Sequence, residues 1–409
     1  MKVTISAARA DHSYKTALLV QNAGLLEKYY TTLYFKPDSF WGQTISSLAT
    51  RFSRLKSLLK KLKSNRHLEG LESQKVVSIP IPELAGRIWR HIPLAGDIIP
   101  WNLLTDNFFD LIVSRKINGC DIFHGWLGYS LHTLKRLNGD GTKILIDMYT
   151  AHPNFRKELL KEEYEMFNLN YQPPDQPLWE KYLKEIELAD HLIAPSPHVY
   201  ETCILQGVPK NKIKIIPFGI DIDRFKPTEK KDKVFRIIYV GAMSINKGVY
   251  YLLEAFKQLR LPRSELVLIG ALQPEFKAIL ANYDGLFKHI CFVPHDQLAN
   301  WYGNSSVFVF PSLTEGSALV TFEAMACGIP SVVTENSGSV VRNDMDGFVI
   351  PIRDIETLKE KMLFLYENEE RRKEMGKSAR KYVGNFTWGK YGERLIGFYQ
   401  SICNEGREN

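Results

Sequence analysis

Residues 311–330 read PSLTEGSALVTFEAMACGIP, and this stretch guides the interpretation of the whole chain. The four apolar residues before it, 307–310, predict a short buried strand. Residues 314–317, Thr-Glu-Gly-Ser, have the composition of a turn, in which Gly316 would let a ligand approach the backbone closely. Residues 318–326 have helical composition, and Gly328 and Pro330 indicate where that helix ends. The stretch therefore predicts a strand, a turn and a helix in direct succession.

A helix that starts directly after this turn would present free backbone N–H groups and a positive dipole end, which suit a diphosphate. Glu315 precedes the helix and Glu323 lies within it. Carboxylates repel phosphate, but they accept hydrogen bonds from hydroxyl groups. The pattern therefore fits a ligand with hydroxyls on both sides of a diphosphate, which describes a nucleotide sugar. The alternative is an ordinary α/β turn with two solvated glutamates.

Glu315 and Glu323, within the pattern PS…EG…E.A.A.G.P, resemble the signature of the family-4 retaining glycosyltransferases. Strands and helices are also expected to alternate across residues 235–350, which favours a parallel doubly wound sheet. The resemblance implies an α/β chain with the GT-B fold, in which two Rossmann-like domains face each other across a cleft. It predicts an acceptor-side domain of residues 1–218, completed by a C-terminal helix over 385–409, and a nucleotide-sugar-binding domain of residues 219–384.

Residues 241–248, GAMSINKG, form a second predicted phosphate-binding turn, with two glycines and Lys247 between a strand and a helix. The family's usual form is GR….KG, in which an Arg and a Lys both hold the diphosphate. Lys247 matches that Lys, whereas Ala242 stands at the Arg position. The resemblance also implies that the end of a strand expected over 290–294 borders the nucleobase. The donor-binding residues predicted in this way are Gly241, Lys247, Val293, Pro294, Glu315, Gly316, Ser317, Ala318, Leu319, Val320 and Glu323.

Two histidines, His124 and His152, are associated with the ends of buried strands predicted in the first half of the chain. Ligands of open parallel sheets bind outside the carboxyl ends of the strands. The family places a histidine in this region that contacts the donor sugar or the acceptor. The sequence leaves open which histidine corresponds, or whether both are structural; His152 is slightly favoured because a helix follows it directly. The predicted catalytic residues are Glu315, Lys247, His152 and His124.

The composition describes a globular chain of 409 residues with a formal net charge of +7, which is too weak to indicate nucleic-acid binding. Its five cysteines are scattered without a C-x-x-C pair, which favours reduced thiols in the cytoplasm over disulfides or a zinc site. No signal peptide and no membrane-spanning stretch is predicted. Residues 221–223 spell D-x-D but match the family's linker pattern, so neither a metal site nor a cofactor is expected.

A basic amphipathic pattern covers residues 48–66, where apolar residues recur at helical spacing between lysines and arginines. Such a helix can lie on an anionic membrane surface. It can equally pack its apolar side on the domain and leave its basic side in water. The sequence leaves both interpretations open, and the first predicts a cytoplasmic enzyme that binds the inner face of the membrane peripherally.

The function implied by the resemblance is transfer of a hexose from a nucleotide-diphosphate sugar to a glycan or lipid-linked acceptor hydroxyl, with retention of configuration and without a metal. UDP is the favoured nucleotide on prior expectation alone. The setting would be the synthesis of cell-surface polysaccharide or glycolipid. Two alternatives stay open: a nucleotide-sugar epimerase, and a catalytically weak subunit that binds a sugar nucleotide. Ala242, and the absence of a Gly-Gly pair in residues 7–10, keep the last alternative open.

Overall fold

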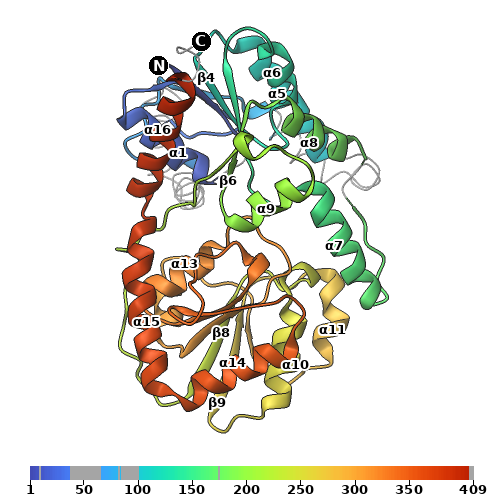
Figure 1. The fold of residues 1–409 in the computed structure, drawn as a ribbon, viewed down its shortest axis with the longest axis vertical. Coiled ribbons are helices and arrows are strands. Elements are labelled where there is room, and N and C mark those ends of the chain that lie inside the picture. The colour runs from blue at the N-terminus through green and yellow to red at the C-terminus, as the bar shows by residue number, and fades with distance from the viewer. Residues whose placement is uncertain (9–10, 37–65, 82, 84–100, 174–175, 405–409) are drawn as a thin grey trace, which may run out of the picture. The chain divides into compact units, whose positions relative to one another are not determined.

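The computed structural model describes residues 1–8, 11–36, 66–81, 83, 101–173 and 176–404. The chain is an α/β protein with two parallel sheets, each of which is flanked by helices, as the sequence predicted (Figure 1). By contacts it divides into one unit of Met1–Met148, Pro174–Ile193 and Gly392–Asn409, and a second of Tyr149–Pro173 and Ala194–Tyr391. The domain boundaries predicted from the sequence stay a prediction.

The first sheet has the strand order β3-β2-β1-β4-β5-β6-β7, with parallel pairing throughout β3 to β6. Its order reverses between β1 and β4, which pair in the register Val3 with Ile122. Its strands are β1 Val3–Ser6, β2 Leu26–Thr31, β3 Val76–Ser78, β4 Ile122–Trp126, β5 Lys143–Asp147, β6 His191–Ala194 and β7 Ile213–Ile215; helices of the first unit include α1 Asp11–Asn22, α5 Trp101–Lys116, α6 Leu131–Leu137 and α8 Gln176–Leu188.

The second sheet has the order β10-β9-β8-β11-β12-β13, again parallel throughout. Apart from the edge strand β10, which is largely exposed, its strands are short and mostly apolar, with mainly buried side chains, as expected where helices cover both faces of a sheet. The strands are β8 Phe235–Val240, β9 Ser264–Ile269, β10 Lys288–Ile290, β11 Val307–Phe310, β12 Ser331–Thr334 and β13 Gly347–Ile350. The strand expected over 290–294 was wrong in its position, because β10 ends at Ile290 and residues 291–297 form a largely exposed loop.

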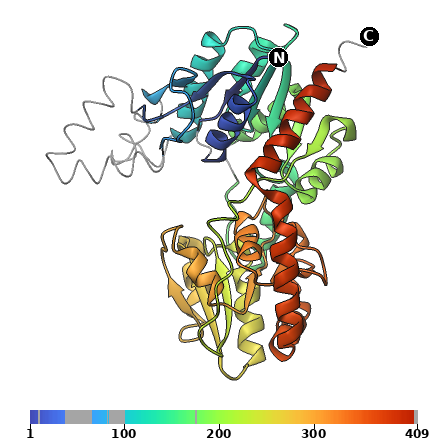
Figure 2. The ribbon, with the colours of Figure 1, turned by 90° about the vertical axis from the view of Figure 1, so that its left-hand side faces the viewer.

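The helices of the second unit pack on the sheet in two groups. Helix α10 packs against α14, and α13 packs against α15 (Figure 1). Figure 2 shows helices on either side of the strands of this sheet. The helices are α7 Pro153–Met166, α9 Pro197–Leu205, α10 Val249–Leu259, α11 Lys277–Ala281, α12 Leu298–Gly303, α13 Leu319–Ala326, α14 Ile355–Glu367 and α15 Glu369–Val383. Helix α16, Trp388–Asn404, begins in this unit, and its residues from Gly392 onward belong to the first unit.

Helix α7 joins the second unit although it follows a strand of the first sheet. The fully buried carboxylate of Glu163 accepts a hydrogen bond from the Tyr251 hydroxyl at 2.6 Å. It also accepts one from Nε of Arg353 at 2.7 Å. These two charge-assisted bonds satisfy a carboxylate that burial would otherwise penalise. They fasten α7 to α10 and to the segment before α14.

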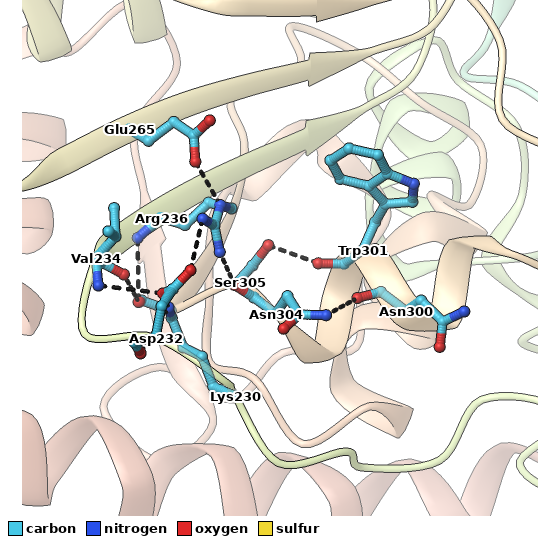
Figure 3. A network of polar contacts seen from close by, with 10 residues as sticks. Lys230, Asp232, Val234, Arg236, Glu265, Asn300, Trp301, Asn304 and Ser305 are labelled. Atoms are coloured by element: carbon cyan, nitrogen blue, oxygen red, sulfur yellow. Dashed lines mark hydrogen bonds and ion pairs between the residues drawn. The ribbon is translucent and has the colours of Figure 1, made fainter.

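The amino end of the second sheet is closed by a network around Arg236 (Figure 3). Its guanidinium donates to the Glu265 carboxylate at 2.6 Å, to Asp232 at 3.0 Å and to the backbone carbonyl of Asn304. The network ties the segment before β8 to β9 and to the end of α12. The charge of Arg236 is paired with the carboxylates of Glu265 and Asp232. We therefore assign this network a structural role at the amino end of the sheet.

The carboxyl end of the second sheet is organised differently. Strands β8 and β11 lie side by side, and the chain leaves them toward opposite halves of the sheet, because β9 and β12 lie on opposite sides of this pair. Such a switch point leaves a crevice between the two following loops, where open α/β sheets bind ligands. The two predicted phosphate-binding turns are those loops.

Candidate active site

The turn before α13 presents unused hydrogen-bond donors. Among the described residues, no acceptor is bonded to the backbone N–H groups of Gly316, Ser317 or Ala318, and no side chain caps α13. The Ser317 hydroxyl is buried and likewise makes no hydrogen bond to a described residue. Buried polar groups normally find a partner, so this group of donors is suited to an anion.

Gly316 is required for a reason that the sequence did not show. A Cβ at this position would lie 1.9 Å from the carbonyl oxygen of Tyr149. The carbonyl of Gly316 accepts a hydrogen bond from Oγ of Ser196 at 2.7 Å. The side of Gly316 toward which a Cβ would project is therefore occupied by the backbone of Tyr149. The consequence is a turn fixed tightly from one side. The approach of a ligand to Gly316, which the sequence suggested, stays a prediction.

Lys247 reaches the same turn from the loop after β8. Its ammonium forms an ion pair with Glu315 and lies 5.7 Å from the centre of the Phe310 ring. The Ser312 hydroxyl is 3.1 Å from the same carboxylate oxygen of Glu315. The lysine and glutamate side chains are 23% and 17% exposed, so both can still be reached from solvent. Two predicted catalytic residues are thus in direct contact.

A glycine allows the loop after β8 to pack closely against the loop after β11. Gly248 has a φ of 63°, and a Cβ there would lie 2.0 Å from the carbonyl oxygen of Pro311. A side chain would be both strained and obstructed at this position. The backbone N–H of Leu313 donates to the Asn246 carbonyl at 3.0 Å and joins the loops further. Oδ1 of Asn246 is a buried acceptor without a described partner.

The start of the β8 loop holds Gly241 and Ala242 in a defined conformation. Gly241 has a φ of 155°, and its carbonyl oxygen would lie 1.9 Å from a Cβ on Gly270. The Tyr239 hydroxyl donates to the Ala242 carbonyl at 2.8 Å. Burial, with a smaller effect of the Glu315 charge, raises the pKa of Tyr239 well above its usual value. Tyr239 therefore remains a hydrogen-bond donor to this loop.

Glu323 points its carboxylate at two donors that sequence reasoning missed. Its side chain is 7% exposed, accepts a hydrogen bond from the Tyr302 hydroxyl at 2.9 Å, and pairs with Nε2 of His295 at 2.7 Å. His295 lies in the loop after β10, two residues from Val293 and next to Pro294. The predicted nucleobase residues and the predicted ribose acceptor are therefore connected through His295.

His152 lies in the second unit and caps α7. Its Nδ1 accepts the N–H of Asn154 at 3.3 Å, and its own backbone N–H donates to Thr202 at 3.0 Å. Burial lowers the pKa of His152 to about 4, so the ring is neutral at neutral pH. The loop that contains it starts at Tyr149, whose carbonyl packs against Gly316. His152 thus lies three residues along the chain from Tyr149, the residue that contacts the turn before α13.

His198 is a second histidine of this region, and sequence reasoning did not single it out. Its Nε2 lies 3.0 Å from the hydroxyl of Thr314, the residue before Glu315. Burial lowers the pKa of His198 to about 4. His198 lies in α9, more than 100 residues before the turn in sequence, and no sequence pattern indicated that the two are in contact.

His124 is placed in the core of the first unit. Its ring is fully buried, stacks on Trp126 at 4.7 Å between ring centres, and contacts the Tyr399 hydroxyl through Nδ1 at 2.6 Å. Its Nε2 lies 3.7 Å from a carboxylate oxygen of Asp147. The structure therefore gives His124 packing and polar contacts inside the core of the first unit, and its role in catalysis stays a prediction.

No group of three or more His, Cys, Asp and Glu side chains in the part of the chain that the structure describes has an arrangement that could hold a metal ion. None of the helices that the structure describes is long and apolar enough to cross a membrane. The basic segment 48–66 lies, apart from Arg66, outside the described residues.

Sequence comparison gives matches to both halves. A family model described as Glycosyltransferase Family 4 matches residues 76–224, and one described as Glycosyl transferases group 1 matches residues 220–382. The capsular polysaccharide biosynthesis glycosyltransferase CapM of Staphylococcus aureus is 29% identical over 53% of this chain and 63% of its own length. A UDP-Gal:alpha-D-GlcNAc-diphosphoundecaprenol alpha-1,3-galactosyltransferase of Escherichia coli is 31% identical over 38% of this chain and 46% of its own.

Structural comparison extends over the chain. Sucrose-phosphate synthase of Thermosynechococcus elongatus is 18% identical, with a TM-score of 0.70 over 98% of this chain and 99% of that one. Anabaena Alr3699/HepE in complex with UDP is 15% identical, with a TM-score of 0.62 over 98% and 100%.

The two parallel sheets and these neighbours define a GT-B fold. With its two halves matched by the two family models, the chain belongs to the family-4 glycosyltransferases. The matched region spans about three fifths of the length of the first curated relatives.

Proposed function

We propose that the protein is a retaining glycosyltransferase that moves a hexose from a nucleotide-diphosphate sugar to a hydroxyl of a glycan or lipid-linked acceptor. The observation that carries the proposal is the meeting of two loops at the β8/β11 switch point. One loop supplies three backbone N–H groups before α13 that have no acceptor in the described part of the chain, and the other supplies Lys247. Family membership adds to this geometry.

The main chemical task of such a transfer is to stabilise the departing diphosphate. Backbone N–H groups and a helix N-terminus fixed in advance stabilise developing negative charge without reorganisation. The amides before α13 and the Lys247 ammonium are the groups that would do this. A metal ion is not required by this arrangement, and the proposed reaction proceeds without one.

The two glutamates take the hydroxyl groups on either side of the diphosphate. Glu323 accepts hydrogen bonds from the ribose, and Glu315, held by Lys247 and Ser312, faces the hydroxyls of the transferred sugar. Glu315 also keeps the ammonium at the turn. Val293 and Pro294 border the nucleobase, and His152 lies beside the transferred sugar.

Retention of the anomeric configuration follows from the family resemblance. A front-face attack, in which the leaving phosphate takes the proton of the acceptor hydroxyl, needs no protein base. This agrees with a group of residues that contains a lysine, two glutamates engaged in other bonds, and a neutral His152.

The nature of the acceptor rests on the relatives. CapM is named for capsular polysaccharide biosynthesis, and the Escherichia coli relative for transfer to a diphosphoundecaprenol-linked sugar. A polysaccharide intermediate on a lipid carrier is accordingly the proposed acceptor, UDP-sugars are the proposed donors, and the proposed location is the cytoplasmic face of a membrane. Residues 48–66 would bind that surface, which a vesicle sedimentation assay with and without this segment tests.

A transfer assay tests the function directly. The protein is mixed with UDP-hexoses and lipid-diphosphate-linked sugars, and products are identified by mass spectrometry and by NMR of the new anomeric centre. We expect an α-linked product from an α-linked donor, at a rate unchanged by EDTA. Glu315→Gln and Glu323→Gln should each lower kcat/KM by about 10-fold or more, as expected for lost charge-assisted hydrogen bonds. Full activity of both variants would contradict the proposal, and product formed without acceptor would indicate an epimerase.

A further inference from the structure

The second carboxylate of the proposed donor site belongs to a three-residue unit. Glu323 lies in α13, Tyr302 in α12, and His295 in the loop after β10. The Tyr302 hydroxyl donates to Oε2 of Glu323 at 2.9 Å, and Nε2 of His295 lies 2.7 Å from Oε1. Each carboxylate oxygen therefore has one donor already in place.

The two donors differ in their surroundings. Tyr302 is fully buried, and its ring packs against Phe308 and Phe225 at 5.9 and 6.2 Å between centres. Burial, and then the Glu323 charge, raise the pKa of Tyr302 well above its usual value, so its hydroxyl keeps its proton. The His295 side chain is 53% exposed and meets Phe225 edge-on at 5.3 Å.

The hydrogen-bond geometry restricts the Glu323 carboxylate. A carboxylate has about four acceptor positions, two on each oxygen. Tyr302 and His295 occupy one position on each oxygen and leave one on each. Two remaining acceptor positions on one rigid carboxylate match the two neighbouring hydroxyls of a ribose. With only one donor present, the side chain could turn about its terminal torsion, which has no sharp rotamer preference.

We propose that Tyr302 and His295 are positioning residues that orient Glu323 toward the 2′- and 3′-hydroxyls of the donor nucleotide. This inference rests on the proposed function, because it assigns the ribose to Glu323. Neither residue acts on the transferred sugar. Their loss should weaken nucleotide binding through the ribose and leave the contribution of the diphosphate intact.

The experiment compares two ligands on one set of variants by calorimetry. UDP and 2′,3′-dideoxy-UDP differ only in the hydroxyls that Glu323 would accept from. In the wild type we expect the dideoxy compound to bind about 10-fold more weakly or worse, as for two hydrogen bonds to a charged acceptor. In Tyr302→Phe and His295→Ala this ratio should fall to about 3-fold or less. His295→Gln, which keeps a donor, should restore part of the ratio.

A matched control uses another tyrosine of the same unit. The hydroxyl of Tyr283 donates to Glu254 of α10 and not to Glu323, so Tyr283→Phe should leave the ligand ratio at its wild-type value. Near-ultraviolet circular dichroism establishes that each variant is folded.

The outcomes separate the two levels of the proposal. If the wild type binds neither UDP nor any of ADP, GDP and CDP, the proposed function fails, and this inference fails with it. If it binds UDP and the ratio stays at 10-fold or more in folded Tyr302→Phe and His295→Ala, the proposed function stands and the positioning role is overturned. A ratio near 1 in the wild type would also overturn the positioning role, because the ribose hydroxyls would then contribute nothing to the affinity.

Discussion

At the scale of single residues, the proposed donor site depends on the Lys247 ammonium and on the contacts that hold it in place. Lys247 is paired with Glu315 and lies over the Phe310 ring. Such contacts fix a flexible side chain at a defined place, which lowers the entropy lost when it binds an anion. Ala242 stands at the position where the family's usual pattern has a second cation, an Arg.

Ala242 therefore offers a gain-of-function test. It lies two residues after the end of β8, in the same loop as Lys247, and is partly exposed. An Ala242→Arg variant should bind UDP about 3- to 10-fold more tightly, since guanidinium groups make charge-assisted bonds to phosphate. Ala278→Arg on α11 adds the same charge at an exposed position and should change little. Equal effects of the two substitutions, measured by calorimetry, would show that only net charge matters.

His198 predicts a pH dependence of stability. Its folded-state pKa of about 4 lies below the ordinary value of about 6.5, because of burial. Between these values the unfolded chain takes a proton and the folded chain does not, so stability is fully present above about pH 6.5 and is lost toward pH 4. His198→Gln keeps a donor for Thr314 and does not titrate. The urea midpoint of the variant should fall less between pH 7 and 5 than that of the wild type; parallel declines would contradict this.

At the scale of elements, the turn before α13 is supported by segments that are distant in sequence. Tyr149 packs on Gly316, Ser196 bonds to its carbonyl, and His198 contacts Thr314. All belong to segments that follow strands of the first sheet but join the second unit. The contacts of α7 with the second unit therefore help to place the loop before α7, which contains Tyr149, beside the turn before α13.

The fastening of α7 gives a prediction with a built-in control. Glu163→Ala removes a fully buried carboxylate from Tyr251 and Arg353 and should destabilise the protein by about 2–4 kcal/mol, because buried partners are left unpaired. Neighbouring Glu162 also pairs with Arg353, at 3.2 Å, but is 63% exposed. Glu162→Ala should cost about 0–1 kcal/mol. Chemical denaturation measures the free energy of unfolding of both variants. Similar losses would contradict the prediction that Glu163 stabilises the position of α7.

The strand, turn and helix around Gly316 could be predicted because each depends on local sequence. The predicted helix over 318–326 differs from α13 by one residue, and the apolar run 307–310 is β11. The strand expected over 290–294 begins two residues later and ends four residues later than β10, since apolar residues continue past Ile290 into an exposed loop. A run of apolar residues does not show where pairing with a neighbouring strand ends.

At the scale of the whole molecule, the sequence predicted two doubly wound sheets, and this is confirmed. The contacts of Tyr302, His295 and His198 could not be predicted, because they join segments through tertiary packing and have no periodic signal. His124 shows the same limit: its position near the end of a strand fits both a ligand contact and a core residue, and the structure buries it.

The central claim is that a nucleotide diphosphate binds at the turn before α13 with Lys247 as its cation. Calorimetry of UDP and UMP with the wild type and with Lys247→Ala tests it most directly, with Lys277→Ala on α11 as an exposed control. We expect loss of the β-phosphate to weaken binding about 10-fold or more in the wild type and in the control, and by less than about 3-fold in Lys247→Ala. The same penalty for UMP in all three proteins would contradict the account.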